Sequence, residues 1–198
     1  MRFVHAMLVN ICAAALLACA LNAHAVEPAW SVADLMQRLG QVKSVRAKFV
    51  ERKQLRILNA PLQFSGTLIY KAPGHLEKHT LLPKPQSLVL TDDRLTVEDP
   101  AKKQRRTLSL QDYPVVWAFV ESIRATLAGD VQALNRFYKV ELEGGEADWR
   151  LVLRPIEPAL QSMVSVIRIS GARERVRVIE IVEGEGDRSI MTITESAP

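Results

Sequence analysis

The spacing of apolar residues along the chain changes at residue 44. Between Ser31 and Leu39 apolar residues recur at helical spacing, and Ser31 is a favoured N-cap residue, so a short amphipathic helix is predicted there. From Ser44 onward apolar and polar residues alternate instead. This alternation is typical of strands with one buried and one solvent-facing side, as in antiparallel sheets.

Strand patterns continue at short intervals to the end of the chain. The first two lie within 44–55 and 61–74, and the others are at 76–82, 86–91, 94–98, 102–109, 137–143, 148–154, 163–170, 174–183 and 187–195. Turn-forming sequences such as EGGEAD and EGEGD separate them. About eleven strands with few helices between them predict a mainly β fold: one open antiparallel barrel or half-barrel, in a single domain.

One helical segment interrupts these strands, between Pro114 and Ala128. Proline suits the first turn of a helix and Gly129 is a natural stop, and a short helical turn is predicted after it at 131–137. Glu121 and Arg124 lie on the side opposite a broad apolar face. The members of that face are Val115, Val116, Phe119, Val120, Ile123 and Leu127. Two interpretations stay open: the helix fills the core of the sheet, or it is a lid over an apolar cavity.

The alternation also predicts which strand residues face the hollow of the curved sheet. These are Val45, Ala47, Phe49, Leu62, Phe64, Leu68, Tyr70, Leu88, Leu90, Leu95, Val97, Trp149, Leu151 and Leu153. In 163–170 and 174–183 apolar residues occupy both phases, so the pattern assigns no face there. The same residues would serve either a ligand cavity or a dry core packed against the helices.

The N-terminal segment has the features of an export signal. Arg2 precedes an apolar run over 7–21 that is too short to span a membrane, and the sequence AHA ends at Ala25. We therefore expect residues 1–25 to be a cleaved signal peptide and 26–198 to be the mature domain of an exported protein. As an alternative, LLAC resembles a lipobox, which would leave Cys19 as an acylated first residue.

Composition and charge exclude several classes of protein. The chain has 198 residues, 48% of them hydrophobic, with 26 Lys and Arg against 22 Asp and Glu. This balance excludes a disordered tail and a dedicated nucleic-acid binder. The densest basic run contains Lys102, Lys103, Arg105 and Arg106. It fits a charged edge strand that resists aggregation, or a docking site for an acidic partner or anionic headgroups.

Little in the sequence indicates catalysis. His75, Glu77 and His79 share one face of a predicted strand, which is a possible metal-ligand spacing, but a solvated strand face is the favoured interpretation. The acidic sequence at 183–187 is interpreted as a hairpin turn, since it lacks calcium-loop spacing. The sequence has no G-x-S-x-G motif, and both cysteines, Cys12 and Cys19, lie in the signal segment. We expect no enzyme, no cofactor and no metal site.

Several motifs occur in a characteristic order behind the signal segment: VRAKF at 45–49, FSGTLIYKAPG at 64–74 and PKPQSLVLTDDRL at 83–95. Together they resemble the LolA-like periplasmic lipoprotein carriers. The resemblance implies an open half-barrel of roughly eleven strands whose helices cover a hydrophobic cavity for acyl chains. Ala72 departs from the family pattern, because many carriers have a basic residue before this proline that is linked to lid closure. The aromatic often found after the Asp-containing turn is also replaced, around Thr96. The sequence over 108–130 is unlike the typical carrier as well, which suggests a divergent branch with another acylated cargo.

The expected function is therefore that of a monomeric periplasmic carrier for a lipoprotein or other lipid-linked molecule. The resemblance implies an inner-membrane donor complex and an outer-membrane acceptor as partners, and no nucleic acid. One alternative is an outer-membrane-anchored receptor of the same fold, lipidated at Cys19. The other is a secreted hydrolase that uses His75, Glu77 and His79.

Overall fold

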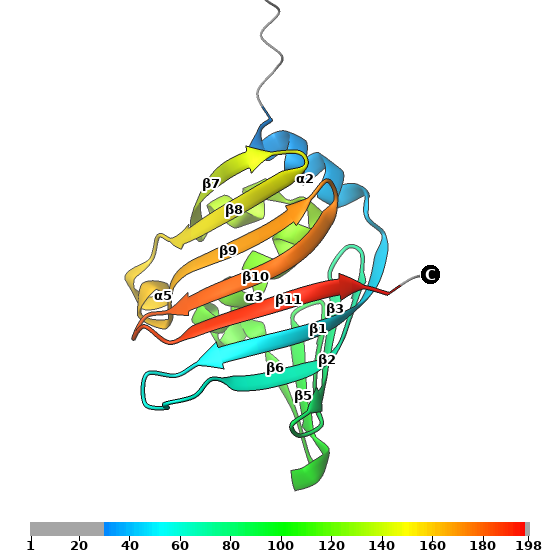
Figure 1. The fold of residues 1–198 in the computed structure, drawn as a ribbon, viewed down its shortest axis with the longest axis vertical. Helices are drawn as coiled ribbons and strands as arrows, with labels where there is room; N and C mark the ends of the chain where they lie inside the picture. The colour runs from blue at the N-terminus through cyan, green and yellow to red at the C-terminus, as the bar shows by residue number, and fades with distance from the viewer. Residues whose placement is uncertain (1–29, 197–198) are drawn as a thin grey trace, which may run out of the picture.

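The computed structural model describes residues 30–196 (Figure 1). The predictions of a signal peptide, of cleavage after Ala25 and of acylation at Cys19 concern residues outside this range. They stay predictions.

The strands of the chain form one twisted sheet. They are β1 (Ser44–Gln54), β2 (Leu62–Lys71), β3 (His75–Leu82), β4 (Gln86–Thr91), β5 (Arg94–Asp99), β6 (Gln104–Ser109), β7 (Tyr138–Gly145), β8 (Asp148–Pro155), β9 (Val164–Ala172), β10 (Arg175–Glu183) and β11 (Arg188–Glu195). Their order is β6-β5-β4-β3-β2-β1-β11-β10-β9-β8-β7, and the first and last strands pair antiparallel in the middle of the sheet. The predicted mainly β fold with an open antiparallel sheet is confirmed.

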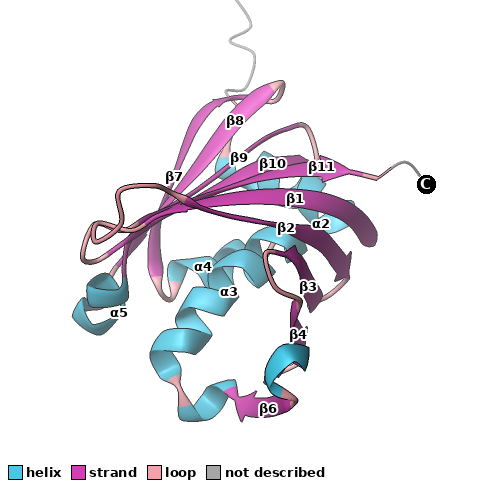
Figure 2. Ribbon diagram, turned by 60° about the horizontal axis from the view of Figure 1, so that its bottom comes forward, coloured by secondary structure: helices cyan, strands magenta, loops and turns pink. Residues whose placement is uncertain are grey.

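Helices lie on the concave side of this sheet, as Figure 2 shows. They are α2 (Val32–Gln41), α3 (Pro114–Ala128), α4 (Val131–Asn135) and α5 (Pro158–Met163), with two short 3-10 turns, η1 (Pro100–Lys102) and η2 (Leu110–Asp112). The sequence missed α5, because six residues are too few to establish a helical period. The strand predicted from residue 102 begins two residues later, since Asp99 caps η1 by accepting a hydrogen bond from the backbone N–H of Lys102.

The connectivity of the sheet explains why α3 crosses its hollow. Strands β6 and β7 are the two opposite edges of the sheet, yet they follow one another in the sequence. The chain must therefore travel from one edge to the other between residues 109 and 138, and η2, α3 and α4 make this crossing under the arch of strands (Figure 2). A solvent-facing helix would not need the apolar surface of α3, whereas a helix enclosed by a sheet does.

Packing of α3 differs from the prediction in one respect. Its most buried residues are small or polar: Ala118, Glu121, Ser122, Ala125 and Thr126. Glu121 lies on the side opposite the cavity-lining residues, as the pattern predicts, but its side chain is buried there and pairs with Arg124 in the same helix. Small side chains on this face allow α3 to approach α2 and α4 closely, which leaves the large apolar side chains for the other face.

A close approach between helices also explains the glycine that ends α3. Gly129 has a φ of 72°, in the left-handed region, and a Cβ there would lie 2.1 Å from the carbonyl oxygen of Met36 in α2. Only glycine satisfies both conditions. The C-terminal end of α3 is thus fixed directly against α2.

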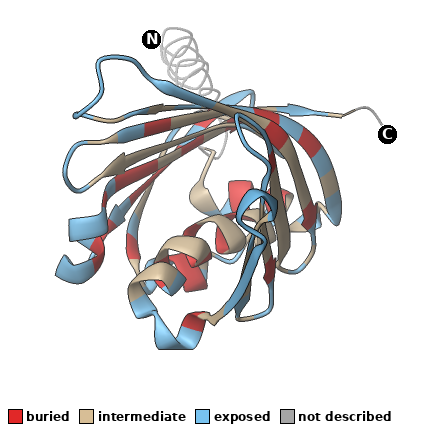
Figure 3. Ribbon diagram, turned by 90° about the horizontal axis from the view of Figure 1, so that it is seen from below, coloured by how far each residue is buried: buried red, intermediate tan, exposed pale blue. Residues whose placement is uncertain are grey.

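The dry core lies under one half of the sheet. Trp149, Leu151 and Leu153 of β8 are fully buried there, against α2, α3 and α4. Tyr138 of β7 donates a hydrogen bond to the carbonyl of Ala118 in α3, at 3.1 Å, and burial raises the pKa of Tyr138 to about 12. Figure 3 shows that the buried positions lie on the helices under the sheet and in bands along the strands. The core therefore closes the β7–β9 half of the hollow.

Irregular pairing between β9 and β10 explains why the sequence assigned no face to these strands. The register shifts between Val176 and Val178 and again between Val182 and Glu183. Each shift exchanges the inner and outer phases, because side chains in a strand alternate between faces. Apolar residues in both phases are the consequence.

Candidate functional site

A cavity of about 580 Å³ lies under the other half of the sheet, between its concave face and α3. Strands β1 to β5, β10 and β11 form its wall, and α3 covers it. Most of the side chains that line it are apolar. Their strand members include Val45, Ala47, Leu68, Tyr70, Leu76, Leu88, Leu90, Leu95, Val176, Ile179, Ile181, Met191 and Ile193.

The structure brings together about half of the strand residues predicted to face the hollow. Those in the cavity wall are Val45, Ala47, Leu68, Tyr70, Leu88, Leu90 and Leu95. Three others, Trp149, Leu151 and Leu153, lie in the dry core instead. The strand phase was right for these three, but α2 and α4 cover this part of the concave face and leave no space beside it.

The remaining predicted wall residues lie on strands of the cavity but do not border it. Phe49 is buried, with the ammonium of Lys78 5.1 Å from its ring centroid. Leu62 is exposed at the start of β2, and Phe64 and Val97 are half-buried. The strand ends extend past the part of the sheet that α3 covers.

Helix α3 presents its large apolar side chains to the cavity. Phe119, Val120, Ile123 and Leu127 line it, and Phe119 and Ile123 also touch the edge of the dry core, as Val115 does; Val116 is half-buried. The four cavity-lining residues are only half-buried, although α3 lies under the sheet. Their partial exposure means that the space in front of them is not filled by other side chains.

One hydrogen bond joins α3 directly to the wall. The Tyr70 hydroxyl of β2 donates to the carbonyl oxygen of Leu127, at 3.2 Å, and burial raises the pKa of Tyr70. Beside it, the stem of Arg124 packs against Gly74 in the β2–β3 turn, where a Cβ would lie 3.0 Å from Cδ of the arginine. The turn that carries Ala72 therefore contacts a basic side chain that comes from the helix.

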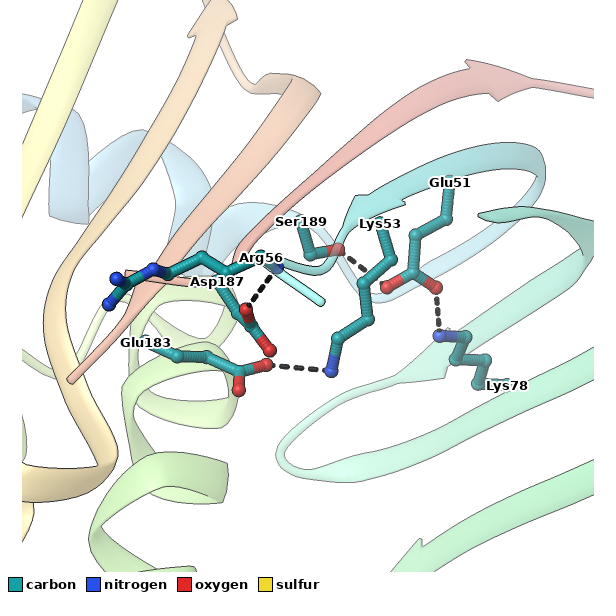
Figure 4. A network of polar contacts seen from close by, with 7 residues as sticks. All are labelled: Glu51, Lys53, Arg56, Lys78, Glu183, Asp187 and Ser189. Carbon is teal, nitrogen blue, oxygen red and sulfur yellow. Dashed lines mark hydrogen bonds and ion pairs between the residues drawn. The ribbon is translucent and has the colours of Figure 1, made fainter. Parts of the chain in front are cut away.

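Charged side chains interrupt the apolar wall of the cavity, and Figure 4 shows how they contact one another. Glu51 of β1 accepts hydrogen bonds from Lys78 of β3 at 2.5 Å and from the Ser189 hydroxyl of β11 at 2.6 Å. Lys53, two residues after Glu51, donates to Glu183 of β10 at 2.7 Å. We call these five residues the polar cluster, and all five line the cavity.

Glu51 is ionised at neutral pH. Burial by itself would raise the pKa of its carboxyl, but the charge of Lys78 and hydrogen bonds from Lys78 and Ser189 outweigh burial, and the charge of Lys53 adds to them. The pKa of Glu51 is therefore lowered. The sequence contained a signal for this cluster, because Glu51 and Lys53 continue the inward phase of Val45, Ala47 and Phe49 along β1.

The histidines weighed as metal ligands lie on β3. Glu77 accepts hydrogen bonds from His75 Nε2 at 2.7 Å and from His79 Nε2 at 2.6 Å, and these bonds lower the pKa of Glu77. Within residues 30–196, no group of three or more His, Cys, Asp or Glu residues is arranged to hold a metal ion. The carboxylate of Glu77 is occupied by its two histidine neighbours.

The basic run lies at an edge of the sheet. Lys102 and Lys103 are in the β5–β6 turn, Arg105 and Arg106 are in edge strand β6, and all four are exposed. Lys102 pairs with Asp99 at 3.5 Å. A charged edge of this kind disfavours strand pairing with another molecule. In the acidic turn, Asp187 accepts a hydrogen bond from the backbone N–H of Arg56.

Comparison of the sequence with family models identifies the family of the chain. The model described as "Outer membrane lipoprotein carrier protein LolA-like" matches residues 21–197. The chain belongs to this LolA-like family. No curated protein matches the LolA-like chain. Within residues 30–196, none of its helices has the length and apolar character needed to cross a membrane.

Several solved structures resemble the LolA-like chain in overall fold. A LolA superfamily protein from Nitrosomonas europaea has 12% identity and a TM-score of 0.45, over 86% of this chain and 96% of the other. An outer membrane lipoprotein-sorting protein domain from Vibrio parahaemolyticus has 8% identity and a TM-score of 0.45, over 84% and 91%. A MucA/MucB complex from Pseudomonas aeruginosa contains a chain with 15% identity and a TM-score of 0.48, over 84% and 58%. At these low scores the similarities carry no argument about ligand or partner.

Proposed function

We propose that this LolA-like chain is a periplasmic carrier that holds the acyl chain of a lipoprotein or another lipid-linked molecule in the cavity under α3. One observation carries the proposal. Helix α3 packs its small residues into the dry core and directs Phe119, Val120, Ile123 and Leu127 toward unfilled space. A helix that only completed a core would bury its large apolar side chains.

The energetics of the cavity suit an acyl chain. Each methylene removed from water contributes about 0.8 kcal/mol, so a chain of roughly 12 carbons gains about 10 kcal/mol before the losses of entropy on binding. No chemical step is needed for such a ligand, since binding and release are the whole function. Delivery toward the outer membrane, and transfer between a donor and an acceptor complex, are part of this proposal. The exposed basic edge at Lys102, Lys103, Arg105 and Arg106 would be one surface for docking to an acidic partner.

Mass spectrometry of the protein purified from a periplasmic fraction tests the proposal. Under native conditions we expect a mass that exceeds that of the chain from Val26, and under denaturing conditions we expect a lipid to separate from it. A chain that begins at an acylated Cys19 would support the anchored receptor instead. A chain from Val26 that carries no lipid and binds no acyl probe in titration would contradict the carrier function.

The contact between Tyr70 and α3 gives a test of the lid hypothesis. Tyr70→Phe removes the hydrogen bond to the carbonyl of Leu127 but keeps the aromatic ring in the wall. A hydrogen bond of this kind contributes about 1 kcal/mol, so we expect a bound lipophilic dye to dissociate roughly five times faster in stopped-flow dilution. The association rate should stay the same, so the affinity for the dye should fall only because the dye dissociates faster.

Tyr113→Phe is the matched control for this experiment. Tyr113 is half exposed just before α3, and its side chain makes no capping hydrogen bond with that helix. Dissociation from the control should equal that from the unchanged protein. Equal rates for all three proteins would mean that α3 does not control exit from the cavity.

A further inference from the structure

The polar cluster has an unusual position for charged groups, because it lies on the concave face of the sheet, where most of the side chains that line the cavity are apolar. Glu51 and Lys78 have only 13% and 27% of their side-chain surfaces exposed, and Lys53 and Glu183 have 31% and 36%. The same phase of β1 carries Val45, Ala47 and Phe49 further along the strand. An apolar residue would therefore fit the local pattern at each of these positions.

Stability alone does not explain the cluster. Removing two opposite charges from water is costly, and well-packed apolar residues in place of a buried ion pair are often neutral or stabilising. The pairs are also not needed to hold the strands, since β1 and β11 are joined by backbone pairing along eight residues. A role in binding a ligand inside the cavity would explain why charged residues occupy these positions.

Both lysines have donors to spare. A lysine ammonium carries three N–H groups. Among residues 30–196, Lys53 donates a hydrogen bond only to Glu183, and Lys78 donates only to Glu51. Each ammonium therefore has N–H groups that no hydrogen-bond acceptor within residues 30–196 takes up, although Lys78 also faces the ring of Phe49 at 5.1 Å, and both lysines line the cavity.

The scaffold around the cluster is fixed before any ligand arrives. The β1–β2 loop is joined to the β10–β11 turn by Arg56, whose backbone N–H donates to Asp187 at 2.9 Å (Figure 4). The guanidinium of Arg56 also donates to the carbonyl of Glu185, at 2.8 Å. Lys53 and Glu183 lie just before these two fastened segments. A site that is held in this way loses little entropy when it binds.

We propose that the polar cluster is a subsite for the head of the acyl ligand, with Lys53 and Lys78 donating hydrogen bonds to its oxygen atoms. The tail would occupy the apolar part of the cavity, so this inference rests on the proposed function. Each lysine is already matched by one glutamate, so the cluster has no net charge and disfavours a multiply charged anion. The chemistry that fits is carbonyl-type oxygen at the end of the chain, in a single carboxylate or in an ester.

Three ligands that share a 12-carbon chain test the subsite: dodecanoate, methyl dodecanoate and dodecane, each measured by displacement of a neutral naphthylamine dye. Lys53→Met should weaken the binding of dodecanoate by about tenfold, since a hydrogen bond to a charged group is lost. The affinity for dodecane should stay unchanged. A weaker effect on the ester than on dodecanoate would identify a free carboxylate as the head. Equal effects on both would identify an ester carbonyl.

Two further variants test whether the effect of Lys53→Met arises from damage to the fold or from the loss of any ion pair. Glu183→Gln removes the carboxylate that competes for Lys53, so it should strengthen the binding of dodecanoate several-fold. Damage to the fold could not produce tighter binding. Lys139→Met breaks a similar ion pair with Glu141, at 2.8 Å on an exposed part of β7, and should change nothing. The proposed subsite is contradicted if Lys53→Met weakens the binding of dodecane as much as that of dodecanoate, or if it weakens the binding of neither ligand. Failure of dodecane to bind the unchanged protein would instead contradict the carrier function itself.

Discussion

Ile179→Glu is expected to weaken binding of a 12-carbon acyl probe by about 100-fold while the protein still folds, because burial of an ionised carboxylate against an acyl chain costs several kcal/mol. Ile179 lies in β10, pairs with Met191 of β11 and lines the cavity wall at the edge of the dry core. Its side chain is half-buried rather than packed on all sides. The new carboxylate can therefore remain hydrated in the empty cavity, and the main cost arises when a ligand must enter.

Thr192→Glu is the matched control for this substitution. Thr192 is exposed on β11, and it alternates with Met191 and Ile193, which line the cavity, so its side chain points to the outer face. Equilibrium titration with the fluorescent dye measures both variants, and circular dichroism confirms that each is folded. Unchanged binding by Ile179→Glu would mean that acyl chains bind elsewhere or not at all.

Trp149→Ala is expected to lower the free energy of unfolding by about 3–5 kcal/mol, the usual range for removal of a buried aromatic side chain. Trp149 is fully buried in the dry core, and its indole N–H donates to the carbonyl of Arg173 at 2.8 Å. The ring also packs against the backbone at Gly171, where a Cβ would lie 2.6 Å from Cζ2. Truncation leaves a cavity in the core and leaves the carbonyl of Arg173 without its hydrogen-bond donor.

Leu88→Ala provides the comparison that separates core from cavity. Leu88 of β4 borders the cavity, so part of its surface already lacks protein neighbours. Fewer contacts are lost on truncation, and we expect a cost below about 2 kcal/mol. Urea unfolding of both variants measures the difference. Equal costs for the two substitutions would indicate that the space beside Leu88 is filled in solution.

These experiments divide the concave face as the structure does, into a packed half and a hollow half. The division was not visible in the sequence, because Leu68 and Leu151 occur in the same alternating pattern. What distinguishes them is the cover opposite: α2 and α4 pack in the core with β8, whereas α3 lies across the cavity that β1 to β5 line. An alternating strand records which face is inward, but not whether another element fills the space in front of it.

The sequence by itself determined most of the elements, the antiparallel character of the sheet and the inward phase of β1, β2, β4, β5 and β8, because each depends on local spacing and turn residues. It also contained the charges of the polar cluster, in the continued phase of Glu51 and Lys53. Only the tertiary structure decided which face of α3 meets the core. Small residues such as Ala118 and Ala125 pack closely with neighbouring helices and turn Phe119 and Ile123 toward the cavity. The crossing from edge strand β6 to edge strand β7 imposes this arrangement, and a connection between distant edges is a property of the whole sheet.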